Sequence, residues 1–183
     1  MSNLANYVAL QLLWLAAVMG AGHGLAWAGP AALALFALYQ LQPRRRARGD
    51  ATLMALALLL GAGVDTALAA GGWVRYAAAL PPAPWAPLWI LALWAGFALT
   101  FNHSLAWVMQ QPWRATLFGA VFGPLGYVLA ARGWQAVTLS APLLHAVLAL
   151  ALAWAAALAV LSLATRRLSA TAQPAPRIGG AAP

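Results

Sequence analysis

Residues 43–72 read PRRRARGDATLMALALLLGAGVDTALAAGG and contain a helix stop, an arginine cluster, an apolar run and a glycine pair. The apolar run from Ala51 to Ala70 has the length of about 20 residues that an α-helix needs to cross a bilayer. Its only ionisable side chain is Asp65. The stretch therefore predicts a membrane-spanning helix that follows an arginine-rich loop and carries one acid within the bilayer.

The composition of the whole chain agrees with that prediction. The 183 residues are 64% hydrophobic and 7% charged, with a mean hydropathy of +0.80, which excludes an ordinary water-soluble domain. The chain has no cysteine, and its three histidines are widely spaced, so neither a disulfide framework nor a metal site is expected. No cofactor motif is present, and an enzymatic activity is not the favoured expectation.

Apolar runs of similar length recur along the chain and are separated by Gly, Pro and Arg. They predict an all-α polytopic membrane bundle over residues 1–168, followed by a disordered cytoplasmic tail over 169–183. The stretch 73–87 is rich in proline and aromatic residues and is expected to be an interfacial loop. Six spans are expected, at about 4–20, 25–41, 51–70, 88–109, 113–131 and 141–164.

The arginines orient the predicted bundle. Six spans place both termini on one side, together with Arg44, Arg45, Arg46, Arg48, Arg114, Arg166, Arg167 and Arg177. Only Arg75 and Arg132 fall on the opposite side. The positive-inside rule then predicts that both termini face the cytoplasm of a multi-pass protein in the bacterial inner membrane. The same placement argues against nucleic-acid binding, and leaves the cluster Arg44 to Arg48 as a topology signal or a contact for anionic lipid headgroups.

Polar side chains within a bilayer are costly and are therefore candidates for function. Asp65 is expected in the outer third of the membrane, at the level of Tyr127 and His145 and near Arg75 and Arg132. Two interpretations are open. Asp65 fixes helices by bonding one of these arginines or Tyr127, or it handles protons or polarises a substrate.

A second polar layer is expected near the cytoplasmic boundary. His103 is flanked by Asn102 and Ser104, and Gln11 of the first span reaches the same height. The two layers are about 13 Å apart along the membrane normal, so Asp65 and His103 are not expected to form a dyad. Adjacent residues diverge around a helix, so His103 and Ser104 are not a catalytic pair by themselves. A purely structural His103 is the alternative to a functional one.

Small and aromatic residues suggest how the helices pack. Gly119 and Gly123, followed by Pro124, form a small-residue strip in the fifth predicted span. Packing between neighbouring helices of one chain is favoured over a homodimer contact. Trp14, Trp94 and Trp154 lie deep in their spans, where they either wall an apolar pocket or only fill the core.

Four sequence motifs carry a resemblance to a known family: Gln11-x-x-Trp14, Asp65, Phe97-x-x-x-Phe101-Asn102-His103-Ser104 and Gly119-x-x-x-Gly123-Pro124-Leu125-x-Tyr127. Through these motifs the chain resembles a family of small bacterial inner-membrane proteins known as domain of unknown function 2878. The resemblance extends to about Ala164 and implies no established activity. It implies these positions to test: Gln11, Trp14, Asp65, His103, Ser104, Gly123, Pro124 and Tyr127. Members of that family are encoded near methyltransferases similar to cyclopropane-fatty-acid synthase and near flavin-dependent oxidoreductases, which implies a role beside membrane acyl lipids.

Three functions follow as hypotheses. The first is an accessory or lipid-binding subunit in acyl-lipid modification, with membrane lipid as its ligand. The second is a small proton-linked transporter that uses Asp65, although no inverted repeat relates the two halves of the chain. The third is a structural assembly factor that packs against another membrane protein.

Overall fold

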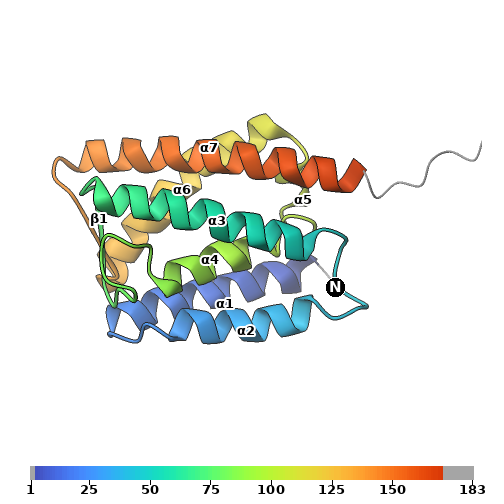
Figure 1. The fold of residues 1–183 in the computed structure, drawn as a ribbon, viewed down its shortest axis with the longest axis horizontal. Helices are drawn as coiled ribbons and strands as arrows, with labels where there is room; N and C mark the ends of the chain where they lie inside the picture. Colours follow the sequence, from blue (N-terminus) through green and yellow to red (C-terminus); the bar gives the residue numbers. More distant parts are fainter. Residues whose placement is uncertain (1–2, 171–183) are drawn as a thin grey trace, which may run out of the picture.

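α-Helices that run side by side along one direction form the body of the protein (Figure 1). The structure is a computed structural model that describes residues 3–170. Its helices are α1 (Asn3–Gly22), α2 (Ala28–Gln40), α3 (Asp50–Ala70), α4 (Leu88–Ala98), α5 (Ala106–Met109), α6 (Pro112–Trp134) and α7 (Leu143–Ala170). The predicted all-α membrane bundle is confirmed.

The predicted number of full-length spans is wrong. Four helices, α1, α3, α6 and α7, are long and apolar enough to cross a membrane, whereas α2 has 13 residues and α4 has 11. The predicted span 88–109 is interrupted after Ala98. There the hydroxyl of Thr100 donates to the Phe97 carbonyl at 2.6 Å, and the Asn6 amide donates to the Leu99 carbonyl at 3.1 Å. Side chains that bond the backbone in this way compete with the next helical turn.

A short antiparallel ladder, which the sequence analysis did not predict, closes the end of the bundle opposite the N-terminus (Figure 1). Strand β1 (Val74–Tyr76) pairs with β2 (Val137–Leu139), with Arg75 opposite Thr138. The predicted interfacial loop 73–87 therefore begins with a strand. The ladder connects the segments after α3 and α6 and holds Tyr76 at this end of both helices, which we call the outer end because it lies opposite the N-terminus.

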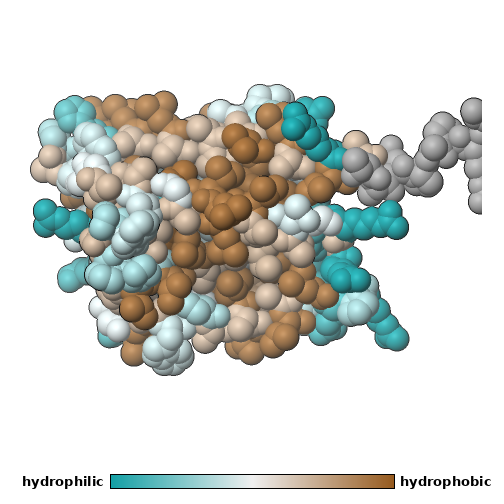
Figure 2. All heavy atoms as spheres, in the orientation of Figure 1, coloured by the Kyte–Doolittle hydropathy of each residue, from teal (hydrophilic) through white to brown (hydrophobic). Residues whose placement is uncertain are grey.

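The distribution of polar groups along the bundle matches a membrane protein. The start of α1, the α2–α3 loop, the start of α6 and the end of α7 lie at one end of the molecule (Figure 1). On the face that Figure 2 shows, hydrophilic residues gather at the two ends and a hydrophobic belt lies between them. α7 continues to Ala170, so the predicted tail does not begin at residue 169. The rest of that tail, residues 171–183, lies outside the described residues.

Two tryptophans, the buried Trp94 and the partly buried Trp154, stack inside the bundle, and glycines of α3 and α6 face them. Trp94 of α4 and Trp154 of α7 stack with their ring centroids 4.3 Å apart. A Cβ atom at Gly61 would lie 2.3 Å from the Trp94 ring, and one at Gly123 would lie 2.4 Å from the Trp154 ring. These glycines therefore allow α3 and α6 to approach the stacked indoles, because a larger side chain would displace them.

Candidate functional site

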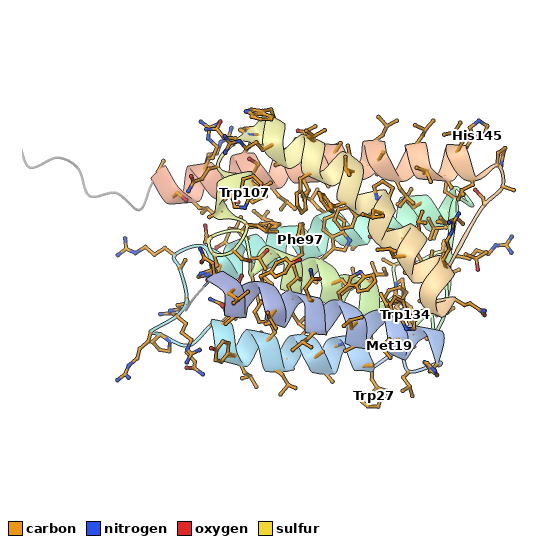
Figure 3. The ribbon with its side chains drawn as sticks, turned by 180° about the vertical axis from the view of Figure 1, so that it is seen from behind. Met19, Trp27, Phe97, Trp107, Trp134 and His145 are labelled. Carbon is orange, nitrogen blue, oxygen red and sulfur yellow. The ribbon has the colours of Figure 1, made fainter. Side chains whose placement is uncertain are left out.

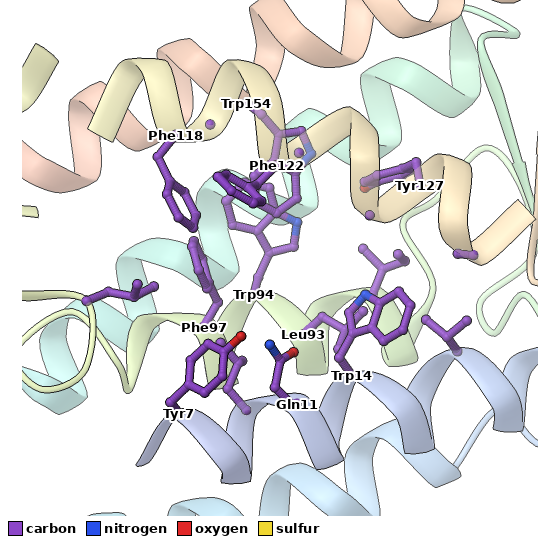
Figure 4. A pocket seen from close by; sticks show the side chains of 18 of the residues that line it. Tyr7, Gln11, Trp14, Leu93, Trp94, Phe97, Phe118, Phe122, Tyr127 and Trp154 are labelled. Carbon is purple, nitrogen blue, oxygen red and sulfur yellow. The ribbon is translucent and has the colours of Figure 1, made fainter. Parts of the chain in front are cut away.

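A cavity of about 480 Å³ lies between α1, α4 and α6, with Trp154 of α7 completing its wall (Figure 4). Its lining is mostly aromatic and aliphatic. Phe122 and Trp107 belong to the lining and yet are 52% and 61% exposed, so the cavity opens through the side of the bundle. In Figure 3 Phe97 is visible between α1 and α6, away from both ends of the bundle. We call this cavity the aromatic cleft.

Three polar side chains of α1 point into the aromatic cleft. Tyr7, Gln11 and Trp14 line it, and their spacing of four and three residues places them on one helix face (Figure 4). Within residues 3–170, the Tyr7 hydroxyl, the Gln11 amide and the Trp14 indole nitrogen make no hydrogen bond. Opposite them, a Cβ at Gly126 of α6 would meet only Trp14 Nε1, at 3.9 Å. Because Gly126 has no side chain, the cleft remains open at this position.

Asp65 lies next to the outer part of the aromatic cleft and is completely buried. Its carboxylate accepts hydrogen bonds from the Tyr76 hydroxyl and from the Trp94 indole, each at 2.6 Å, and a third from the Tyr127 hydroxyl. Trp94 reaches the carboxylate because Gly61, one turn before Asp65 on α3, leaves room for the ring. We call Asp65, Tyr76, Trp94 and Tyr127 the Asp65 cluster.

The surroundings of Tyr76 keep its hydroxyl neutral. Burial raises the pKa of Tyr76 well above its ordinary value, and the nearby Tyr127 and Asp65 raise this pKa further. Tyr76 therefore remains a hydrogen-bond donor to Asp65 at any physiological pH. Since Trp94 and Tyr127 also line the aromatic cleft, the Asp65 cluster fixes the rings that form its outer wall.

A second polar network lies where α1, α2, α3 and the α4–α5 connection meet. Asp50, 1% exposed, accepts from the Asn102 amide at 2.8 Å and from the Ala47 backbone N–H at 2.8 Å. His103 Nε2 lies 3.0 Å from Asp50 Oδ2 and also 3.0 Å from the Gln40 amide nitrogen. With a hydrogen on Nε2 the imidazole donates to Asp50, and without it the imidazole accepts from Gln40.

This network continues to α1 through two amides. The buried Asn6 donates from its amide to Gln40 Oε1 at 3.0 Å, and its carbonyl oxygen accepts from the Ser104 hydroxyl at 2.7 Å. Gln40 donates in turn to the Arg45 carbonyl at 3.3 Å. We call these residues the Asp50 network: Asn6, Gln40, Asp50, Asn102, His103 and Ser104. They join the interrupted fourth span to the arginine-rich loop.

Comparison with known proteins places the chain in a family. The model of the family described as "Protein of unknown function (DUF2878)" matches residues 3–160. The chain belongs to this family. No curated protein and no solved structure matches it. In this DUF2878 chain, the aromatic cleft, the Asp65 cluster and the Asp50 network all fall within the matched residues.

The DUF2878 chain brings together only some of the residues that the sequence analysis grouped. Asp65 bonds Tyr127, but neither Arg75 nor Arg132 bonds it within residues 3–170. His145 is exposed at an outer corner of the bundle (Figure 3). Gln11 lines the aromatic cleft and takes no part in the Asp50 network.

The sequence did not predict several members of the Asp65 cluster and of the Asp50 network. Asn6, Gln40 and Asp50 lie at the ends of helices, where polar residues usually face water or headgroups, so their burial had no signal in the sequence. Tyr76 was assigned to a loop, and the unpredicted β-ladder positions it. Trp94 was expected either to wall an apolar pocket or only to fill the core; it lines the cleft, and its bond to Asp65 was not expected.

The small-residue strip of α6 lies against α7 of the same chain. A Cβ at Gly119 would lie 2.5 Å from the Trp154 carbonyl oxygen, and Pro124 is buried next to Gly123. Both glycines also line the aromatic cleft. Within residues 3–170 no three His, Cys, Asp or Glu side chains come close enough to hold a metal ion. The lining of the cleft is mostly apolar and includes a few hydrogen-bond donors, which is typical of a site for an apolar ligand.

Proposed function

We propose that this protein is a lipid-binding membrane subunit, and that the aromatic cleft holds the apolar part of a membrane lipid. The observation that carries the proposal is a cavity of about 480 Å³ that is lined mostly by aromatic and aliphatic side chains and opens through the side of the bundle. Cavities of about 300 to 1,000 Å³ with a mostly apolar lining and few polar groups are the usual sites of small ligands.

The position of the cleft supports a ligand that arrives through the bilayer. Tyr7 and Phe122 line it from α1 and α6, and both are exposed on the side of the bundle. A lipid can therefore enter between these helices without passing through the polar ends of the molecule. The family resemblance implies a role beside enzymes of acyl-lipid modification. In this proposal, those enzymes use the lipid that the cleft holds.

Proton-linked transport through Asp65 has less support. Both carboxylate oxygens of Asp65 are engaged by fixed donors, and the side chain is completely buried behind Trp94 and Tyr127. An acid held in this way is typical of a structural anchor, because a transported proton or substrate needs a route to the carboxylate. Lipid binding is accordingly the function for which we design the test.

Filling the cleft tests the proposal. We expect Gly126→Leu to place an isobutyl group beside Trp14 Nε1, inside the cleft and away from the backbone of other helices. Gly63→Leu is the matched control, because Gly63 also lies within a long helix and a Cβ there meets nothing within 4 Å. Both changes replace a helical glycine by a good helix former, so neither should weaken the fold.

The measurement is native mass spectrometry of protein released from mild detergent micelles. We expect wild type and Gly63→Leu to retain one bound lipid per chain, and Gly126→Leu to lose it while its thermal midpoint stays at the wild-type value. Equal lipid occupancy in all three proteins, or no retained lipid in any of them, would overturn the proposal.

A further inference from the structure

We infer that the aromatic cleft is built for a lipid with a flat, carbonyl-bearing ring, the chemistry of an isoprenoid quinone, with the ring beside Gln11 and Trp14. This inference rests on the proposed lipid binding and specifies its ligand. It starts from polar groups that an acyl chain would leave without a partner.

Gln11 is the first of these groups. Its amide is exposed to the aromatic cleft and makes no hydrogen bond within residues 3–170. On an ideal helix it lies about 12 Å along α1 from Asn3, which is about two fifths of the way across a hydrocarbon core of about 30 Å when that core begins at the start of the helix. An amide without a partner in an apolar medium costs free energy, so a ligand that supplies the partner at this depth gains affinity.

Trp14 and Tyr7 define what that partner is. The Trp14 indole N–H can only donate, and it projects into the cleft one turn beyond Gln11, while the Tyr7 hydroxyl lies one turn before it (Figure 4). A carbonyl oxygen can accept from the amide and the indole together. The carbonyls of phospholipid esters lie at the edge of the hydrocarbon core, whereas a quinone ring carries its carbonyls to the depth of the tail.

The aromatic walls supply the second argument, which concerns shape. Phe97 and Phe118 are nearly parallel, with an interplanar angle of 18°, and Phe118 stacks on Phe122 with their centroids 4.4 Å apart. The stacked pair of Trp94 and Trp154 continues the wall. Flat aromatic faces gain from offset stacking with another flat ring, an interaction that a flexible acyl chain does not offer. The side opening leaves the isoprenoid tail free to extend into the bilayer.

The test measures binding of decylubiquinone to the purified protein in lipid nanodiscs by calorimetry, with empty nanodiscs subtracted. We expect saturable binding at one site per chain. Gln11→Met keeps the size of the side chain and removes the amide, so we expect binding to weaken about tenfold, the loss for a hydrogen bond of about 1.4 kcal/mol. Trp14→Phe should weaken binding in the same direction, and Trp27→Phe, an exposed tryptophan outside the cleft, should leave it unchanged.

Two further readouts separate this inference from the proposal beneath it. Gln11→Met should retain the wild-type thermal midpoint, because it removes an unpaired amide from an exposed position. Gly126→Leu should abolish decylubiquinone binding. If wild type fails to bind decylubiquinone, or if Gln11→Met binds it equally well, the quinone inference is wrong. If Gly126→Leu still loses a bound phospholipid, the lipid-binding proposal stands without the quinone inference. If Gly126→Leu loses no phospholipid, the lipid-binding proposal and the quinone inference are both wrong.

Discussion

Asp50 and Asp65 are the two acids of the chain, and they share a helix and a buried position but differ in the side chains that surround them. Both belong to α3, about 22 Å apart on an ideal helix, and both are buried, at 1% and 0% exposure. Each carboxylate accepts from groups on several elements. Asp65 is surrounded by rings in the outer half of the bundle, whereas Asp50 lies among amides and an imidazole beside the arginine-rich loop.

The partners decide how each acid contributes to the fold. The partners of Asp65 are hydroxyl and indole donors that come from β1, α4 and α6, and each of them donates a hydrogen bond to its carboxylate. The Asp50 network contains Asn6 and Gln40, whose amides both donate and accept, and His103, 15% exposed, which water can reach. We conclude that the Asp65 cluster is a rigid clamp, and that the Asp50 network can rearrange.

The largest effect should come from Asp65→Ala. The substitution leaves the donors of Tyr76, Trp94 and Tyr127 without an acceptor, and each buried donor left unpaired costs about 1 to 3 kcal/mol. We expect the free energy of unfolding to fall by at least about 3 kcal/mol, measured by reversible SDS unfolding in mixed micelles. Asp65→Asn keeps one acceptor oxygen and should lose less. A loss in Asp65→Ala no greater than in Asp65→Asn would contradict the clamp.

Asp50→Ala is the matched experiment at the other end of α3. It also deprives three groups of an acceptor, namely the Ala47 N–H, the Asn102 amide and the His103 ring. These groups are only partly buried, so water and the neighbouring amides can satisfy them. We expect a loss of about 1 to 2 kcal/mol, including the favourable effect of a carboxylate at the start of a helix. The same SDS titration applies. Equal losses for Asp50→Ala and Asp65→Ala would remove the distinction between the two regions.

The same contrast explains what the sequence could predict. Asp65 stood out because an acid in an apolar run is conspicuous, and Tyr127 was predicted as a partner because helical rise places both at one depth. Asp50 follows the arginines, where an acid normally faces water, so sequence alone assigned it to a loop. Its burial depends on the break after Ala98, which brings Asn102 and His103 to the start of α3.

That break is also the reason why the number of full spans was overestimated. The run 88–109 is apolar enough for one helix, and hydropathy does not register a local competition for backbone carbonyls. The interruption depends on Asn6, which lies more than 90 residues earlier and bonds the Leu99 carbonyl. For the aromatic cleft, the sequence left open whether Trp14, Trp94 and Trp154 wall a pocket or only fill the core, because a cavity depends on how closely α1 and α6 approach.

The smallest effect that sharpens the comparison concerns alkaline pH. Burial holds the pKa of Tyr76 well above its ordinary value of about 10, so the folded protein keeps this proton at a pH where the unfolded chain releases it. The folded state then binds more protons than the unfolded state, and stability falls as the pH rises above about 10, by up to about 1.4 kcal/mol per unit.

Tyr76→Phe removes that contribution. Its free energy of unfolding should therefore decline less steeply than that of wild type between pH 9.5 and 11, two values within about one unit of the ordinary tyrosine pKa. Tyr39→Phe is the control for the loss of a tyrosine hydroxyl at an exposed position outside both regions. The Asp50 network contains no tyrosine, so this alkaline loss is specific to the Asp65 end. An unchanged slope in Tyr76→Phe would mean that water reaches the hydroxyl, and that the clamp around Asp65 is as open as the network around Asp50.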